Sequence, residues 1–148
     1  NCTMLFGHLE SRNDRLHHLD ALRTQQDKSG GFVCFIPLPF QTRHNQLSGI
    51  TPLSGIDELK TIAVSRLMLD NIPHIKSYWV MLGLKQAQAA QFFGADDLDG
   101  TVVEEKIGHM AGADSPQVLS RKELEDMITG CGLQPCERDG LFRPLPRR

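Results

Sequence analysis

The chain of 148 residues is long enough to form one domain with a substantial core. Hydrophobic residues make up 40% and charged residues 23%, a balance typical of globular proteins that argues against a disordered chain. A net charge of −2 gives no electrostatic reason to expect nucleic acid as a partner. No segment approaches the roughly 20 apolar residues that span a bilayer, and none resembles a signal peptide. We therefore expect a soluble, cytoplasmic protein without a membrane partner.

Strand-like and helix-like segments alternate along the chain. Short apolar runs predict strands over residues 3–6, 32–36, 75–82 and 98–103. Capping patterns and apolar residues at helical spacing predict helices over residues 12–29, 55–69, 84–93, 104–110 and 121–130. Ser11 with Asp14, and Ser120 with Glu123, have the spacing of capping boxes, which defines where the first and last of these helices begin.

The alternation predicts an α/β fold with a parallel sheet and helical crossovers. Four such units form either an open sheet or half of an eightfold barrel, and the pattern alone slightly favours the open sheet. We expect these units over residues 1–113, and a helix with an irregular tail over residues 114–148. Half a barrel would leave strand edges unpaired, so in that arrangement we expect self-association or a covering partner.

In a parallel β/α protein, ligands bind where the strands run into the segments that follow them. After the first expected strand this rule selects Gly7, His8 and Glu10. Glycine lets a ligand approach the backbone, histidine exchanges protons near neutral pH, and a carboxylate binds hydroxyl or amine groups. After the second strand, Pro37 and Phe40 offer walls for an adenine ring. The structural alternatives are an ordinary turn at Glu10 and a rigid loop anchored by Phe40.

The same rule selects candidates for substrate binding near the later strands: Asn45, Trp79, Met81, Asp99, Thr101 and Glu104. The large side chains of Trp79 and Met81 are of a kind found more often in a core than in the wall of a ligand site. His74 and Lys76 lie where the third strand begins, at the end of the fold associated with stability, so we expect structural roles for them.

We expect no metal site in this chain. The cysteines are Cys2, Cys34, Cys131 and Cys136. None of them forms a C-x-x-C pair, so we expect reduced thiols. The acidic residues 96–99 do not favour a divalent metal, because two of their three carboxylates belong to the turn that enters the fourth strand. Phosphate-binding glycine motifs are also absent.

Several segments together resemble one enzyme family. They read TMLFGHLE, GGFVCFIPLPF, SRLMLDNIPHIKSYWVMLG and GADDLDGTVVEEKIGHMAGA, and they are similar to the aminofutalosine synthases, radical SAM enzymes of menaquinone biosynthesis. The resemblance runs from Thr3 to about Phe142. It implies the second half of a (β/α) TIM-type barrel, with these units as strands five to eight, and so reverses the preference for an open sheet. Related futalosine cyclases and deazaflavin-cofactor synthases share a looser skeleton.

The resemblance also implies cofactors and a small-molecule substrate. The family's reaction adds a 5′-deoxyadenosyl radical, made from S-adenosylmethionine at a 4Fe-4S cluster, to 3-[(1-carboxyvinyl)oxy]benzoate. Its cluster is held by C-x-x-x-C-x-x-C, a spacing that this chain lacks, so we expect the ligands in a missing N-terminal half-barrel and no activity from this chain alone. The first residue, Asn1, is not a methionine, which favours a partial sequence. Outside the family, the alternatives are a nucleoside-binding module and a structural half-barrel.

Overall fold

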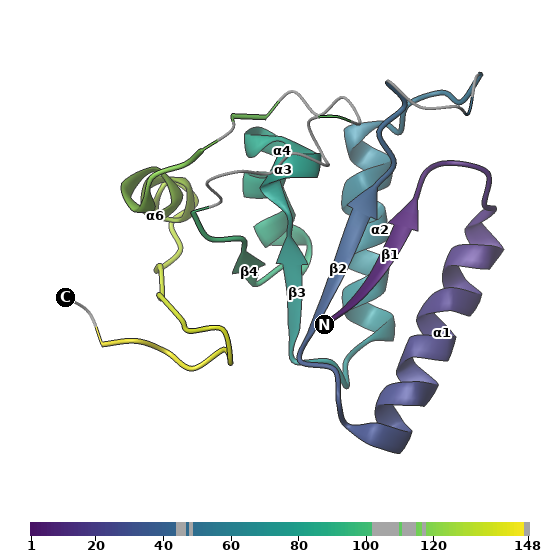
Figure 1. The fold of residues 1–148 in the computed structure, drawn as a ribbon, viewed down its shortest axis with the longest axis horizontal. Helices are drawn as coiled ribbons and strands as arrows, with labels where there is room; N and C mark the ends of the chain where they lie inside the picture. The colour runs from purple at the N-terminus through teal and green to yellow at the C-terminus, as the bar shows by residue number, and fades with distance from the viewer. Residues whose placement is uncertain (44–46, 48, 102–109, 111–114, 117, 147–148) are drawn as a thin grey trace.

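A computed structural model describes residues 1–43, 47, 49–101, 110, 115–116 and 118–146 of the chain (Figure 1). Its centre is a four-stranded sheet in the order β1-β2-β3-β4. The strands are β1 (Cys2–Phe6), β2 (Cys34–Pro39), β3 (His74–Ser77) and β4 (Asp97–Leu98). Each strand pairs in parallel with the next one along the chain. The predicted α/β fold with a parallel sheet is confirmed, and four neighbouring strands in chain order are consistent with part of a (β/α) barrel.

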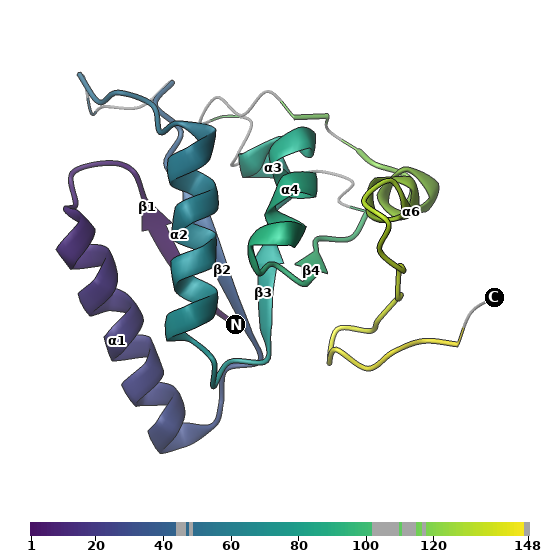
Figure 2. The ribbon, with the colours of Figure 1, turned by 180° about the vertical axis from the view of Figure 1, so that it is seen from behind.

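Helices follow the strands and pack mainly on one face of the sheet. They are α1 (Arg12–Ser29), α2 (Gly55–Met68), α3 (Trp79–Leu82), α4 (Leu84–Ala90), the 3₁₀ turn η1 (Gln91–Phe93) and α6 (Arg121–Thr129). Figure 2 shows α2 lying in front of β1 and β2, with α1 beside it. The predicted capping boxes at Ser11 and Ser120 are confirmed, because each serine accepts a hydrogen bond from the backbone N–H three residues later. No described helix is both long and apolar enough to cross a membrane.

The core lies between the sheet and these helices. Phe6, Phe35 and Ile75 project from neighbouring strands and are completely buried, as are Leu19 of α1 and Ile62 of α2. Side chains alternate along β1, so its second and fourth residues face the opposite side. That second face is the more open one, and Leu5 is 47% exposed on it.

β2 continues through Pro37 and Pro39, beyond the predicted end of this strand at residue 36. Alternate residues of a strand bond to opposite neighbours. The Phe40 amide donates to the carbonyl of Phe6 in β1 (2.7 Å), so positions 37 and 39 face β3. The β2–β3 pairing reaches only to Phe35, so both prolines lie past the end of that ladder. Because no hydrogen bond between β2 and β3 is made there, the N–H that a proline lacks is not needed.

β3 is shorter than the sequence indicated. The predicted strand over residues 75–82 is wrong beyond Ser77, because Trp79–Leu82 form a helical turn in which the Gly83 amide donates to the Trp79 carbonyl (2.8 Å). A short apolar run fits a buried strand and a buried helical turn equally well, so its composition did not separate the two. The predicted strand over 98–103 is also wrong at Asp99, Gly100 and Thr101, which follow β4; residues 102–109, including most of the predicted fourth helix, lie outside the described residues.

The tail returns to the sheet as an irregular segment, which we call the C-terminal strap (residues 136–146). Arg138 and Pro144 form an isolated antiparallel bridge that closes its hairpin-like turn. The Arg138 guanidinium reaches Asp97 of β4, and the Phe142 ring stacks on His74 of β3 with ring centroids 4.7 Å apart. The strap therefore packs against the ends at which β3 and β4 begin (Figure 1).

We predict that the 148-residue chain self-associates, because β1 is an edge strand whose Leu5 is exposed on the open face. Light scattering should give an apparent mass that rises with concentration above the 16.5 kDa of one chain. Leu5→Lys should reduce this association, because a charge on an edge strand opposes edge-to-edge pairing. Leu9→Lys is the control, since Leu9 is exposed outside the sheet. A monodisperse wild-type monomer with a sharp thermal transition would contradict the prediction.

Candidate functional site at the carboxyl ends of the strands

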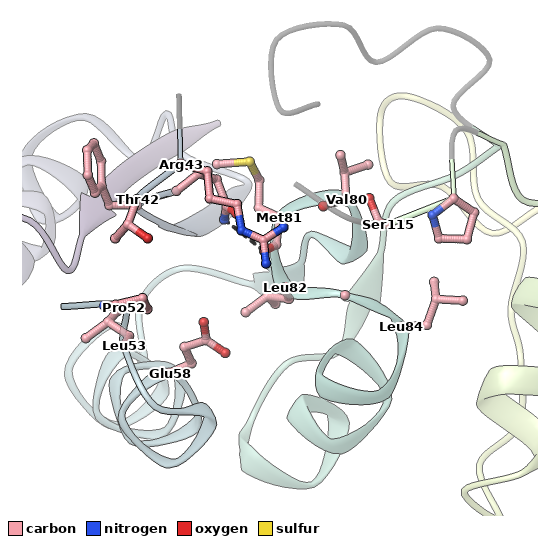
Figure 3. Close-up of a pocket in the computed structure, with 14 residues that line it drawn as sticks. Thr42, Arg43, Pro52, Leu53, Glu58, Val80, Met81, Leu82, Leu84 and Ser115 are labelled. Atoms are coloured by element: carbon pink, nitrogen blue, oxygen red, sulfur yellow. Dashed lines mark hydrogen bonds between the residues drawn. The ribbon is translucent and has the colours of Figure 1, made fainter. Parts of the chain in front are cut away.

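A pocket of about 410 Å³ opens beyond the carboxyl ends of β2 and β3. This is the end of a parallel sheet where ligand sites form, and the volume lies within the range of small-molecule sites. Two predicted residues, Phe40 and Met81, line it. The Gln41 amide joins their two segments by donating to the Met81 carbonyl (3.1 Å) and to the Pro39 carbonyl (3.2 Å). Figure 3 shows Met81 among the lining residues, with Leu82 below it in the view.

The walls of the pocket combine apolar and ionisable side chains. The full lining comprises Phe40, Gln41, Thr42, Arg43, Pro52, Leu53, Glu58, Val80, Met81, Leu82, Gly83, Leu84, Ser115 and Pro116. A guanidinium and a carboxyl thus line one cavity together with apolar side chains such as Leu53 and Leu84. Polar groups that converge beside apolar side chains in a concave site can orient a small organic ligand.

His8 lies beside this pocket. Its ring meets Phe40 edge-on, with centroids 5.8 Å apart and the planes inclined by 70°. Two residues predicted to bind a cofactor are thereby brought together, although they come from the segments that follow different strands. His8 Nδ1 also lies 3.4 Å from a carboxylate oxygen of Glu10.

Glu10 is engaged within the protein. Its carboxylate accepts hydrogen bonds from the backbone N–H groups of Gly7 (2.5 Å) and His8 (2.8 Å) and from Arg15 Nε (2.7 Å). Burial alone would raise its pKa, but these bonds to the charged form outweigh burial and lower the pKa below the ordinary value. The geometry is that of the turn given above as the structural alternative, so Glu10 shapes the backbone next to the pocket.

Gly7 is required by backbone geometry. Its φ of +91° lies in a region that other residues rarely adopt, and a Cβ atom here would lie 2.4 Å from Leu53 Cδ1. Because Leu53 lines the pocket, the missing side chain of Gly7 allows the loop before α2 to close against the end of β1. Gly7 thus helps to build the pocket wall.

The remaining predicted residues are distributed between buried positions and a second hollow. Pro37 is buried in β2, and Trp79 is completely buried in α3. Thr101 is exposed, whereas Asn45 and Glu104 lie outside the described residues. Asp99 lines a smaller hollow of about 230 Å³ together with Ile36, Leu38 and Tyr78.

Asp99 is held at this hollow by two residues. Lys76 Nζ lies 2.5 Å from its carboxylate, and the indole N–H of Trp79 donates to its backbone carbonyl at 3.3 Å. Lys76 is buried and lies 3.6 Å from Asp97, so it stands between two carboxylates. His74, at the beginning of β3, instead pairs with Asp96 (2.8 Å).

Glu58 is a pocket residue that the sequence-based prediction missed. It lies in the first turn of α2, where a carboxylate ordinarily serves only to favour the helix dipole. Figure 3 shows its carboxyl pointing from α2 into the pocket. Burial raises its pKa to about 7, although a hydrogen bond with Gln86 opposes the rise. Glu58 follows the long connection between β2 and α2, and this position was the one signal in the sequence that could have indicated it. The rule that selects residues directly after a strand does not extend into the following helix.

The shifted Glu58 carboxyl predicts a pH-dependent stability. Its folded-state pKa of about 7 exceeds the ordinary 4.5, so between these values the folded chain keeps a proton that the unfolded chain has lost. The free energy of unfolding should therefore fall as pH rises through this window, by about 1–3 kcal/mol. Urea unfolding at a series of pH values should show that Glu58→Gln removes this part of the slope. Asp20→Asn, at an exposed carboxylate of α1, is the control. An unchanged slope in Glu58→Gln would contradict the assignment.

The described residues do not fit an iron–sulfur cluster. They contain no group of three or more metal-binding side chains. Cys2 and Cys34 are buried, and burial raises the pKa of the Cys34 thiol to about 12, which opposes the thiolate that an iron ligand requires. Cys131 and Cys136 are on the part of the chain that contains α6 and the strap, away from both hollows.

Comparison with known proteins finds a matching family model and similar enzymes. The family model described as the CofH/MqnC C-terminal region matches residues 29–147. Aminodeoxyfutalosine synthase of Thermus thermophilus is 48% identical across 98% of this chain and 40% of its own length. The synthase of Streptomyces coelicolor is 46% identical across 97% of this chain and 40% of its own length.

A second group of relatives carries a different name. The 5-amino-6-(D-ribitylamino)uracil–L-tyrosine 4-hydroxyphenyl transferase of Methanococcoides burtonii is 39% identical across 97% of this chain and 42% of its own length. The chain thus spans about two-fifths of the length of the curated relatives it matches. Since the family model covers most of the sequence, the chain belongs to the family of the CofH/MqnC C-terminal region.

Proposed function

We propose that this chain is the C-terminal part of a radical SAM aminodeoxyfutalosine synthase that acts in menaquinone biosynthesis. The observation that carries the proposal is the 46–48% identity to two synthases, above the 39% to the 5-amino-6-(D-ribitylamino)uracil–L-tyrosine transferase. The proposed substrate is 3-[(1-carboxyvinyl)oxy]benzoate. The position of the pocket at the carboxyl ends of the strands supports an enzyme of this architecture.

In the proposed enzyme, S-adenosylmethionine bound at a 4Fe-4S cluster supplies the 5′-deoxyadenosyl radical. We propose that Gly7, His8 and Phe40 face this cofactor, because they gather beside the pocket. Glu10 would act indirectly by fixing the Gly7–His8 backbone. Met81 would contact the substrate from the pocket wall, and Asp99 from the neighbouring hollow.

The proposed partner is the polypeptide that corresponds to the remaining three-fifths of the relatives. It would contribute the cluster ligands and cover the open face and the edge of the sheet, where Leu5 is exposed. In this arrangement residues 1–113 supply half of the barrel and residues 114–148 pack outside it. We propose that the chain is inactive until this partner is present.

Assembly tests the proposal. The N-terminal three-fifths of the Thermus thermophilus synthase should be fused to this chain, purified and reconstituted anaerobically with iron and sulfide. We expect the fusion to convert the enolpyruvyl benzoate and S-adenosylmethionine into aminodeoxyfutalosine, measured by mass spectrometry. The chain alone should form no product and bind no stoichiometric cluster. In the fusion, His8→Ala should reduce turnover by about 10-fold or more, whereas Lys122→Ala, at an exposed residue of α6, should not.

Parallel incubations separate the alternatives. A fusion that acts only on the futalosine-type cyclase substrate would move the protein to the neighbouring step of the pathway. A fusion that acts only on 5-amino-6-(D-ribitylamino)uracil with L-tyrosine would assign it to the activity named for the relative in Methanococcoides burtonii. Product formation by the unfused chain would contradict the proposed inactivity.

A further inference from the structure

We propose that Arg138 of the C-terminal strap is a positioning residue for Asp99: by occupying Asp97, it leaves Lys76 to hold Asp99 at the hollow. The inference rests on the proposed function, which assigns Asp99 to the substrate. It gives the strap, which lies outside the sheet, a specific role in shaping the site.

Arg138 satisfies Asp97 with two parallel contacts. Its Nε lies 2.6 Å from one carboxylate oxygen and its terminal Nη2 lies 2.7 Å from the other. The Asp97 side chain is only 9% exposed, so this bidentate pair is formed largely out of water. The Phe142 ring lies beneath the guanidinium, 3.8 Å from its central carbon, and restricts its orientation. Asp97 therefore has both oxygens committed to the strap.

The Lys76 ammonium lies between two carboxylates and is closer to one of them. It stands directly opposite Asp97 in the β3–β4 register, yet its ammonium lies 3.6 Å from Asp97 and 2.5 Å from Asp99. The ammonium is compact and can turn toward either partner. Among these four side chains the charges balance, with Arg138 on Asp97 and Lys76 on Asp99. Loss of Arg138 would leave one cation between two carboxylates. Asp97 is the more buried of the two, so leaving its charge unpaired would cost more, and Lys76 would move toward it.

The consequence reaches the hollow. The Asp99 backbone is fixed by the Trp79 indole, while its carboxylate direction depends on Lys76. If Lys76 turned to Asp97, the Asp99 carboxylate would rotate toward solvent and no longer keep its place beside Leu38 and Tyr78. If Asp99 binds the substrate, this rotation would lower the population of correctly placed substrate.

The test compares three variants of the fusion enzyme by crystallography and by kinetics. Arg138→Leu removes the cation. The double variant Arg138→Leu/Asp97→Asn also removes the carboxylate that would capture Lys76, and so restores the charge balance. Arg121→Leu is the control, because Arg121 also contacts the strap, at Glu137 (3.1 Å), without reaching Asp97.

We expect Arg138→Leu to move Lys76 Nζ to within about 3 Å of Asp97 and away from Asp99, and to raise KM by about 10-fold, as for one lost charge-assisted contact. The double variant should return Lys76 to Asp99 and bring KM to within about threefold of wild type. Arg121→Leu should change neither. If Arg138→Leu does not fold, Arg138→Lys provides the comparison, since one contact in place of two frees an Asp97 oxygen.

Two results would overturn the inference: an unchanged Lys76–Asp99 contact when Arg138 is replaced, or a double variant whose KM is no better than that of the single variant. The second result is the one expected if the strap only stabilises the fold. These outcomes are separate from the failure of the proposed function, which would appear as an absence of aminodeoxyfutalosine from the wild-type fusion as well.

Discussion

Replacing Trp79 by alanine should lower the free energy of unfolding by about 3–5 kcal/mol, the loss typical of a truncated core aromatic. The side chain is completely buried in α3, and it packs with the core formed by the sheet and the helices. Its indole also donates to the Asp99 carbonyl, so the alanine variant loses a tie between α3 and the segment that follows β4. Circular dichroism in urea is the appropriate measurement, because Trp79 is the one tryptophan of the sequence and its fluorescence disappears in the variant.

Phe92→Ala is the matched control. Phe92 is also a large aromatic residue, but 65% of its surface is exposed in η1, so its removal should change the free energy of unfolding by less than about 1 kcal/mol. Trp79→Phe separates packing from hydrogen bonding, since it retains most of the ring volume but not the donor, and should cost about 1–2 kcal/mol. A loss below 1 kcal/mol for Trp79→Ala would contradict the buried position of this residue.

Replacing Lys76 by methionine should destabilise the fold by about 2–3 kcal/mol, because it leaves the Asp99 carboxylate without its partner. Methionine preserves the unbranched shape of the stem, so the loss reports mainly on the charge. The estimate is below that for a fully buried pair, because the Asp99 side chain is 24% exposed. A second substitution, Asp99→Asn, should recover part of the loss, because the unpaired charge is then absent as well.

The control for Lys76 is Lys122→Met in α6. Lys122 pairs with Asp126 at 2.6 Å, nearly the distance of the Lys76–Asp99 pair, but its side chain is 80% exposed. The exposed pair should contribute much less to stability, because water screens the attraction between its charges. The two substitutions then differ mainly in the burial of the pair. Equal losses of stability in the two variants would contradict the role of burial in the Lys76–Asp99 pair.

Lys76 contributes both to the stability of the fold and to the hollow that Asp99 lines. Its position near the beginning of the predicted strand over residues 75–82 led to the expectation of a structural role, and its contact with Asp97 is of that kind. Because β3 ends at Ser77, however, Lys76 lies next to the carboxyl end of this strand. The same ammonium, however, holds Asp99, a residue selected as a substrate contact. Position along a strand did not separate these two roles, because a lysine stem is long enough to carry its charge past the next residue on the neighbouring strand.

The sequence by itself determined the order of the elements and the local signals that begin them. The capping boxes at Ser11 and Ser120 depend on residues three apart, so their formation needs no distant contact. The alternation of strands and helices likewise predicted a parallel sheet, since parallel strands need a crossover connection and a helix usually supplies it. Residues from several segments also pointed to the family to which the chain belongs.

Only the tertiary structure decided how side chains from different units meet. β3 ends at Ser77, and the Trp79 indole that follows it donates to the Asp99 carbonyl after β4, a contact that no local pattern predicts. Glu58 acquires its shifted pKa because a pocket closes around it, and Asp99 obtains its direction from a lysine on another strand. Burial and charge pairing are properties of the assembled neighbours, whereas capping and periodicity act within a few residues.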